Sequence, residues 1–406
     1  MKVRIEKGVA SGTVTAPPSK SMAHRLLICA AMADGVSTVR GISTCEDVLA
    51  TLDCLTALGI KTERVGDDVT VYGRSFKEAV PSSPLHCRES GSTLRFMIPA
   101  AMLSGHTAVF YGAGRLMSRP MDVYDKLFKE KGLTFIGDGK SIVARGPLVG
   151  GTYELAGNVS SQFISGLIFA LPVADGDSTI RITTAIESRS YINLTVNAVR
   201  AFGIEVEWAD EYTIKVKGNQ TYSARDITVE GDYSGAAFPD ALGVLGGDVT
   251  VTGLDPDSIQ GDSAYKRYYK MLLDGVPTIH IGDCPDLGPI LFAIAAAKYG
   301  GVFDGTKRLK IKESDRAEAM ATELKKFGTS VTVYEDSVVV YPADFHAPTE
   351  TLSGHNDHRI VMSLAILLTL TGGEIDGAEA VSKSYPDFFE NLASLGIGVT
   401  YISDEA

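Results

Sequence analysis

Cationic and hydroxyl side chains recur at the starts of strongly apolar segments of the sequence. Lys20, Ser21 and Arg25 open one such segment, and the run Ser90–Arg95 opens another. Other segments open with Ser160, Ser161 and Gln162, with Asp286, and with Asp357, His358 and Arg359. If these segments are helices, their first turns carry free N–H groups and a partial positive charge, to which Arg and Lys add full charges. This combination is typical of sites for phosphate and carboxylate groups.

Helix capping is the alternative explanation for each of these polar residues taken singly. Ser, Thr and Asp are the usual N-cap residues, so one Ser-Ser pair needs no further cause. Capping does not account for Arg95 and Arg359, because apolar residues follow both and an unpaired guanidinium is costly to bury. We therefore expect a pocket for a multiply anionic small molecule.

Six apolar helices are expected to position these residues. Each is apolar nearly all round, which indicates burial on every side. They span residues 19–33, 89–103, 160–174, 232–245, 286–297 and 356–368.

A second type of helix also recurs six times, and each copy is followed by a glycine and a β-branched strand. The glycines are Gly59, Gly132, Gly203, Gly275, Gly328 and Gly396, at spacings of 73, 71, 72, 53 and 68 residues. A glycine just past the last helical turn adopts the left-handed conformation without a Cβ clash. Several copies continue through a tight turn into a second strand, as in the hairpin predicted around Gly137–Ser141. Six such units are too many for one hydrophobic core, so we expect two α/β domains with three units each.

Composition narrows the class of protein. The chain has 406 residues, 45% of them hydrophobic, and a net charge of −12, which argues against a general nucleic-acid binder or a basic membrane-surface protein. The charged N-terminus has no signal-peptide core, and no apolar stretch is long enough to span a bilayer. Five cysteines without a CxxC spacing indicate free thiols in a reducing compartment. We expect a cytoplasmic protein with no nucleic-acid or membrane partner.

Two incomplete motifs suggest other functions. Gly112–Met117 is similar to a dinucleotide fingerprint, but it lacks the third glycine and the helix that should follow. His355 and His358 could ligate a metal, but a third ligand is not evident and the two histidines would straddle a helix start. We expect neither dinucleotide binding nor a metal site.

Eight short motifs, in order along the whole chain, resemble those of the 5-enolpyruvylshikimate-3-phosphate synthases, a family of enolpyruvyl transferases. They are PPSKSMAHR (Pro17–Arg25), SGSTLR (Ser90–Arg95), SRP (Ser118–Pro120), SSQF (Ser160–Phe163), ESRSYI (Glu187–Ile192), KESDR (Lys312–Arg316), NDHR (Asn356–Arg359) and SKSYPDFF (Ser382–Phe389). Each piece is weak alone, whereas the ordered set is specific.

The resemblance implies an α/β fold of two domains, each of three βαβαββ repeats that form an inside-out α/β barrel. The first domain would comprise residues 1–15 and 230–406, on the phosphoenolpyruvate side. The second would comprise residues 16–229, on the shikimate 3-phosphate side. The family closes these domains over its substrates, so the crossings near Thr15–Pro18 and Val229–Asp232 would be the hinge.

The reaction implied is transfer of the enolpyruvyl group of phosphoenolpyruvate to the 5-hydroxyl of shikimate 3-phosphate, with release of phosphate. This 3-phosphoshikimate 1-carboxyvinyltransferase activity belongs to the shikimate pathway, which leads through chorismate to the aromatic amino acids. No metal or organic cofactor is expected. The two substrates are the expected partners, and most members of the family are monomers.

The resemblance also assigns individual residues. Those expected to bind shikimate 3-phosphate are Lys20, Ser21, Arg25, Ser160, Ser161, Gln162, Ser188, Tyr191, Asp286 and Lys312. Those expected to bind phosphoenolpyruvate are Lys20, Gly91, Arg95, Arg119, Gln162, Arg316, Arg359 and Lys383. The catalytic candidates for proton transfer are Lys20, Asp286 and Glu313, with His358 close by, and which of them moves which proton stays open.

Two positions depart from the common family pattern. Glu89-Ser90 stands where many members have Asn-Ala, so Ser90 is expected to add an oxygen beside Gly91. This change leaves open the response to glyphosate, the known inhibitor of the family. The segment DLGPI (Asp286–Ile290) stands where many members carry small residues and Met.

Two other functions compete with this interpretation. The related transferase that acts on UDP-N-acetylglucosamine has Asn after the first-motif Lys and usually a loop cysteine, whereas Ser21 follows Lys20 here and Arg115–Arg119 contains no Cys. A non-catalytic anion-binding relative is favoured if Lys20, Glu313 or Arg316 is lost, but all three are present.

Overall fold

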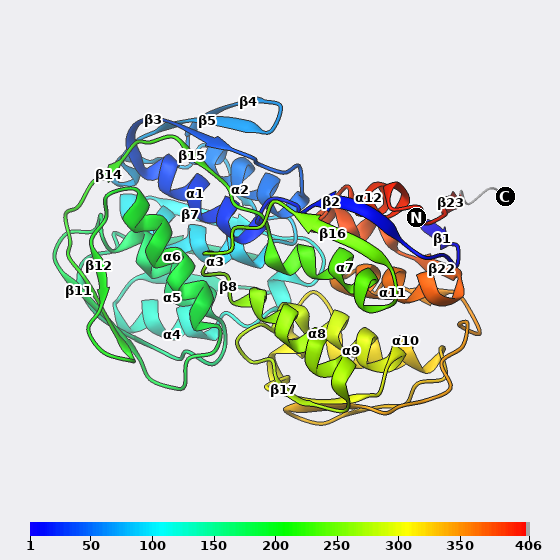
Figure 1. Cartoon of the computed structure of the whole chain (residues 1–406). Helices are drawn as coiled ribbons and strands as arrows, with labels where there is room; N and C mark the ends of the chain where they lie inside the picture. The colour runs from blue at the N-terminus through cyan, green and yellow to red at the C-terminus, as the bar shows by residue number, and fades with distance from the viewer. Residues whose placement is uncertain (403–406) are drawn as a thin grey trace. The chain divides into compact units, whose positions relative to one another are not determined.

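The computed structural model describes residues 1–402, and the chain divides into two compact units (Figure 1). Unit 1 comprises Met1–Pro17 and Gly231–Ala406, and unit 2 comprises Pro18–Glu230. Each unit has its own hydrophobic core. Both are built from one module, in which a strand, a helix and a parallel strand are followed by a second helix and an antiparallel pair of strands.

Three such modules form unit 2. The first contains α1 (Lys20–Met32), β3 (Ala33–Arg40), α2 (Glu46–Ala57), β4 (Lys61–Val65) and β5 (Asp68–Gly73). Its first strand comes from the end of the unit, where β14 (Tyr222–Ser223) and β15 (Ile227–Thr228) pair in parallel with β3. The second contains β6 (Leu85–His86), α3 (Gly91–Ala101), β7 (Thr107–Tyr111), α4 (Asp122–Glu130), β8 (Thr134–Gly137) and β9 (Ser141–Arg145). The third contains β10 (Gly151–Leu155), α5 (Ser161–Ala170), β11 (Ser178–Ile182), α6 (Arg189–Ala201), β12 (Val206–Trp208) and β13 (Thr213–Val216).

Two complete modules and one shorter module form unit 1. One complete module contains β17 (Thr278–His280), α9 (Gly288–Ala297), β18 (Gly301–Asp304), α10 (Arg316–Lys325), β19 (Val331–Val333) and β20 (Ser337–Val340). The other contains β21 (Leu352–Ser353), α11 (His358–Thr371), β22 (Gly373–Asp376), α12 (Phe388–Ser394) and β23 (Val399–Ile402), and β1 (Lys2–Ile5) completes its sheet. Short 3-10 turns link the elements of the two units: η1 (Phe76–Glu78), η2 (Met102–Ser104), η3 (Leu116–Ser118), η4 (Gly261–Ala264), η5 (Pro285–Leu287), η6 (Lys307–Ile311) and η7 (Ala378–Lys383).

The shorter module ends before its pair of antiparallel strands. β2 (Ser11–Thr15) pairs in parallel with β16 (Asp248–Thr252), but from α8 (Tyr265–Asp274) the chain goes directly to β17 of the next sheet. Gly275 accordingly has φ 155° and ψ −143°, outside the left-handed helical region that the other five marker glycines adopt at φ values from 69° to 88°. The absent pair of strands explains why Gly275 and Gly328 are 53 residues apart, while the other spacings are 68 to 73.

The six apolar segments form helices, as the sequence predicts: α1, α3, α5, α7 (Tyr233–Val244), α9 and α11. Five of them have a side-chain N-cap, because Ser19, Ser90, Ser160, Asp232 and Asp357 each accept a hydrogen bond from a backbone N–H of the first turn. Complete burial of each large apolar side chain in these helices contributes about 1.5–3 kcal/mol. Within residues 1–402, no helix combines the length and apolar character needed to cross a membrane.

Gly166 determines how closely α5 approaches α3. A Cβ atom at this position would collide with Tyr124 Oη and with the carbonyl oxygen of Arg95. Tyr124 Oη lies 2.9 Å from the carbonyl oxygens of both Arg95 and Phe163, so one hydroxyl joins the two helices at this contact. The glycine therefore allows α5 to pack against the part of α3 that carries Arg95.

We expect Gly166→Ala to destabilise unit 2 by about 1–3 kcal/mol, because a methyl group forced into this contact must separate α5 from α3. The midpoint of urea unfolding measures the effect. Gly243→Ala is the matched control, because Gly243 is also helical and its Cβ would meet nothing closer than 4.0 Å; alanine there should be neutral or slightly stabilising. Equal midpoints for both variants would show that the α3–α5 contact can relax.

Candidate active site

The first turn of α3 in unit 2 brings several of the predicted site residues together around Gly91. Arg95 Nη1 donates to Gln162 Oε1 at 2.7 Å, and Gln162 Nε2 donates to Ser92 Oγ at 2.9 Å. A Cβ at Gly91 would lie 2.9 Å from Arg95 Nη1 and 3.0 Å from Arg119 Nη1. Glycine at position 91 thus allows two guanidinium groups to approach the start of this helix.

Arg25 lies one helical turn after Ser21 and is held by uncharged oxygen atoms. Its Nη1 donates to the Ser21 carbonyl at 2.7 Å, its Nε to Thr195 Oγ1 at 2.8 Å, and its Nη2 to the Tyr191 carbonyl at 2.9 Å. The residue is only 2% exposed, and burial lowers the pKa of Arg25 to about 10. Because these partners do not neutralise it, the guanidinium is suited to bind a carboxylate.

Lys20, the first residue of α1, forms an ion pair that the sequence did not predict. Its Nζ lies 2.8 Å from Asp47 Oδ2, in the first turn of α2. Both side chains are largely buried. Acidic residues are ordinary in a first helical turn, so nothing in the sequence marks Asp47 as the partner of Lys20.

The three serines expected at the 3-phosphate lie at the starts of two helices that pack against each other. Ser160 is the N-cap of α5 and Ser161 its first residue, and Ser188 is the N-cap of α6. Ser188 has φ 57°, in the left-handed region where residues other than glycine are uncommon. Serine hydroxyls at a helix start, where the helix dipole adds partial positive charge, are suited to bind phosphate.

The Ser90 hydroxyl is engaged inside unit 2, in a buried chain of hydrogen bonds. It lies 3.2 Å from the Thr93 amide nitrogen and 2.8 Å from Thr93 Oγ1. Thr93 contacts Thr51, which contacts His24 Nδ1, with 2.8 Å at each step. The oxygen that the sequence places beside Gly91 is therefore used to cap α3 and to join it to α2 and α1.

In unit 1, Arg316 is the centre of a second cluster. It is the first residue of α10 and 1% exposed. Its Nε donates to Asp357 Oδ2 at 2.9 Å, its Nη1 to Asp286 Oδ1 at 2.8 Å, and its Nη2 to Glu313 Oε2 at 2.7 Å. Burial disfavours the charged form, but the three carboxylates outweigh it and raise the pKa of Arg316 above its ordinary value.

Asp286 also contacts two further cations. Lys312 Nζ lies 3.2 Å from Asp286 Oδ1, and Arg359 Nη2 lies 3.3 Å from Asp286 Oδ2. Arg359 Nη2 also donates to Ser234 Oγ at 2.9 Å. Burial is the largest influence on Lys312; Asp286 opposes it and Arg316 adds to it, and the result is a lowered pKa of Lys312.

Lys383 and His358 lie beside the start of α11. Lys383 Nζ donates to the Asn356 carbonyl at 2.6 Å and to Asn356 Oδ1 at 2.9 Å. His358 is buried, with Nδ1 3.9 Å from Asp357 Oδ1. The ammonium group of Lys383 is thus held by the residue that precedes the N-cap of the helix.

The structure places the predicted residues in two groups. Unit 2 contains Lys20, Ser21, Arg25, Gly91, Arg95, Arg119, Ser160, Ser161, Gln162, Ser188 and Tyr191. Unit 1 contains Asp286, Lys312, Glu313, Arg316, His358, Arg359 and Lys383. The set expected at phosphoenolpyruvate is therefore divided between the units. The sequence did not identify Asp47, Ser234, Asn356 and Asp357 as partners of the site cations. Asp357 was recognised only as a residue that opens a helix, and it shares the NDHR motif with Asn356.

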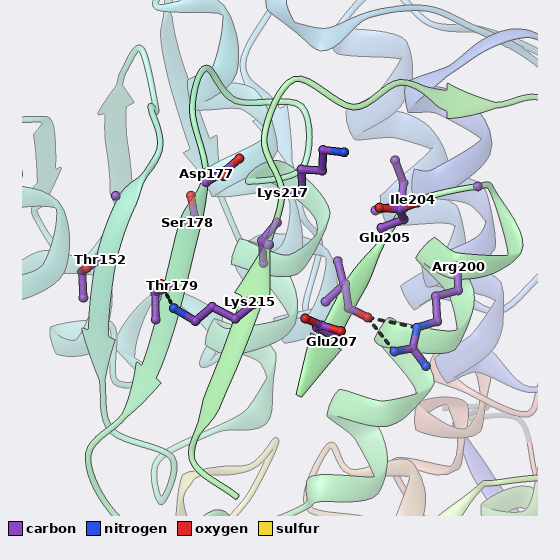
Figure 2. A pocket seen from close by; sticks show the side chains of 14 residues that line it. Thr152, Asp177, Ser178, Thr179, Arg200, Ile204, Glu205, Glu207, Lys215 and Lys217 are labelled. Carbon is purple, nitrogen blue, oxygen red and sulfur yellow. Dashed lines mark hydrogen bonds between the residues drawn. The ribbon is translucent and has the colours of Figure 1, made fainter. Parts of the chain in front are cut away.

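A cavity of about 930 Å³ lies elsewhere in unit 2, against β10 to β13 and the end of α6 (Figure 2). Lys215 Nζ donates to Thr179 Oγ1 at 3.2 Å, and the Arg200 guanidinium donates to the carbonyl of Val206. The lining of the cavity carries both signs of charge, including Lys217 and Glu207. None of the 14 lining residues belongs to the predicted site.

Comparisons with known proteins agree with this architecture and cover most of the chain. Residues 5–274 and 267–392 match the family described as EPSP synthase (3-phosphoshikimate 1-carboxyvinyltransferase). Proteins named 3-phosphoshikimate 1-carboxyvinyltransferase from Clostridium kluyveri and Clostridium acetobutylicum are 39% and 38% identical over 420 and 416 residues, which cover 97% of this chain and 97% of each relative. The chain belongs to the EPSP synthase family.

Solved structures confirm the α/β fold of two domains of repeated units. An EPSP synthase from Acinetobacter baumannii has a TM-score of 0.78 at 25% identity, over 98% of this chain and 100% of the other. The enolpyruvyl transferase NikO from Streptomyces tendae has a TM-score of 0.77 at 16% identity, over 98% of both chains, and shares the fold.

We expect Gly91→Ala to raise the KM for phosphoenolpyruvate about tenfold, because a Cβ would push the Arg95 and Arg119 guanidinium groups away from the start of α3. Steady-state phosphate release measures it. Gly137→Ala, whose Cβ would meet nothing closer than 3.8 Å, should leave the KM unchanged. An unchanged KM in Gly91→Ala would remove Gly91 from this site.

Proposed function

We propose that the protein transfers the enolpyruvyl group of phosphoenolpyruvate to the 5-hydroxyl of shikimate 3-phosphate and releases phosphate. The observation that carries the proposal is the relationship to proteins named for this activity, at 36–39% identity over 97% of each chain. The clusters around Gly91 and Arg316 support it, because the reaction brings two carboxylates and two phosphates together. The UDP-sugar alternative is not favoured by these relatives.

Residues of unit 2 are proposed to bind shikimate 3-phosphate. Arg25, with Ser21, would hold its carboxylate, since the contacts of Arg25 leave its charge uncompensated. The serines at the starts of α5 and α6 would hold the 3-phosphate. The residues proposed for this substrate are Lys20, Ser21, Arg25, Ser160, Ser161, Gln162, Ser188 and Tyr191, with Asp286 and Lys312 of unit 1.

Phosphoenolpyruvate is proposed to be held by cations from both units. Arginine is suited to its carboxylate and phosphate, because the planar guanidinium can form two parallel hydrogen bonds. The residues are Lys20, Gly91, Arg95, Arg119 and Gln162 of unit 2, and Arg316, Arg359 and Lys383 of unit 1. The proposal requires that both sets act on one pair of substrates.

Proton transfer is proposed to use Glu313, Asp286 and Lys20. The 5-hydroxyl must lose its proton to a base, and the methylene carbon of phosphoenolpyruvate must gain one from an acid. Arg316 holds the Glu313 and Asp286 carboxylates at 2.7 and 2.8 Å, which fixes two groups that can accept or return a proton. The proposal needs no cofactor, because the phosphate of the donor is its own leaving group.

The cellular setting is also proposed. We infer a cytoplasmic enzyme that acts as a monomer. Free buried thiols at all five cysteines are what a reducing compartment would maintain.

Phosphate release from the purified protein tests the function. With shikimate 3-phosphate and phosphoenolpyruvate, and no added metal, we expect release. In a parallel reaction UDP-N-acetylglucosamine replaces shikimate 3-phosphate, and we expect none. Release only with the UDP-sugar would overturn the acceptor assignment, and no release in either reaction would favour an anion-binding protein without this activity.

We expect Glu313→Gln to lower kcat by about 10²–10⁴-fold, because an amide cannot exchange the proton that a carboxylate can. Substrate binding should be retained, since glutamine has almost the same shape and can still accept from Arg316. Steady-state kinetics give kcat, and calorimetric titration gives shikimate 3-phosphate affinity. Near-normal turnover would exclude Glu313 from proton transfer.

A further inference from the structure

Two consecutive residues with left-handed backbone precede the N-cap of α11. His355 has φ 50° and Asn356 has φ 52°. A single non-glycine residue in this region costs on the order of 1–2 kcal/mol, so a pair persists only if the surroundings hold it. We call residues 355–356 the left-handed turn. Asp357 follows it directly and Arg359 comes two residues later, so the backbone at this turn sets where both side chains lie.

A buried carboxylate on α10 contacts this turn. Glu323 is 1% exposed. Its Oε1 lies 2.8 Å from His355 Nε2, and its Oε2 accepts from the Ser353 amide at 2.9 Å and lies 3.0 Å from Lys326 Nζ. Burial raises the pKa of the Glu323 carboxyl, but these hydrogen bonds outweigh burial and leave the pKa below its ordinary value. The Glu323 carboxylate thus holds the His355 side chain and also the backbone at Ser353, just before the left-handed turn.

The same helix also holds the other end of the turn. Arg316, seven residues before Glu323, donates to Asp357 at 2.9 Å. Seven residues are about two helical turns, or about 10 Å, and place both side chains on one face of α10. One face of α10 therefore fixes the segment 353–357 at two points, one on each side of the left-handed turn.

The left-handed turn also holds the ammonium group of Lys383. Lys383 Nζ donates to the carbonyl and to the side-chain oxygen of Asn356. A change of φ at residues 355 and 356 would move this carbonyl, the N-cap Asp357 and the start of α11 together.

We propose that Glu323 and His355 are positioning residues, which hold the left-handed turn so that Arg359 and Lys383 are placed to bind phosphoenolpyruvate. This inference rests on the proposed function of the cluster. Neither residue is proposed to touch a substrate.

A comparison of His355→Ala with His355→Gly tests the proposal. Both variants remove the imidazole and its contact with Glu323, but only alanine keeps the cost of the left-handed conformation. We expect the KM for phosphoenolpyruvate to rise about tenfold in His355→Ala, which corresponds to about 1.4 kcal/mol, and about threefold or less in His355→Gly. The KM for shikimate 3-phosphate should change less than twofold. Equal effects in both variants, or equal effects on both KM values, would overturn the proposal.

Glu323→Gln examines the other partner, with Glu350→Gln as its matched control. Glu350 is exposed and lies 3.7 Å from the same Lys326, but it does not contact His355. We expect Glu323→Gln to raise the KM for phosphoenolpyruvate about tenfold, and Glu350→Gln to leave it within twofold. Glu323→Gln could instead lower the melting temperature and change kcat and both KM values by similar factors. That result would show that Glu323 stabilises the unit without positioning the site.

A separate readout distinguishes failure of this inference from failure of the proposed function. Amide hydrogen exchange of the segment 353–359 requires no substrate. We expect faster exchange there in Glu323→Gln and His355→Ala than in the wild type and Glu350→Gln. If wild-type protein releases no phosphate, the proposed function fails, and unchanged exchange in the variants would then overturn the positioning role as well.

Discussion

The cluster in unit 1 depends on one buried guanidinium. Removing one partner from a buried ion pair costs about 3–5 kcal/mol, because the charge that remains has neither water nor a counter-ion. Three carboxylates supply counter-ions to Arg316 in place of water. These come from separate segments: Asp286 precedes α9, Glu313 precedes α10, and Asp357 caps α11. One side chain thus fixes the starts of three helices and brings Arg359 beside Asp286.

In unit 2, by contrast, the partners of the buried Arg25 guanidinium are uncharged. Arg25 is held by two carbonyls and a hydroxyl. Neutral acceptors fix the position of a guanidinium without cancelling its charge, whereas the carboxylates around Arg316 both fix and neutralise it. The two clusters are therefore suited to different tasks. The uncompensated charge in unit 2 favours binding of anionic groups, and the carboxylates in unit 1 are held in position to take part in proton transfer.

The sequence predicted those features whose cause is local. Apolar helices, their Ser or Asp caps and five of the six glycine turns follow from residues within about one helical turn. Gly275 looks like the other five, but the strand after it belongs to the next sheet, and only the 53-residue spacing indicated this. The cations at helix starts were likewise visible. Their partners Asp47 and Ser234 were not, because these pairs form between elements that only tertiary packing brings together.

Backbone strain ahead of the site helices was also invisible in the sequence, and it recurs in a common arrangement. Four of the five non-glycine residues with positive φ in residues 1–402 lie within three residues of the start of α3, α6 or α11. Before α3, Arg88 is held by Glu46 and Asp53, which are seven residues apart on α2. This repeats the way in which α10 holds the turn before α11. In both units the outer helix of one module therefore fixes the strained entry to the buried helix of the next, and with it the polar first turn that carries the site residues.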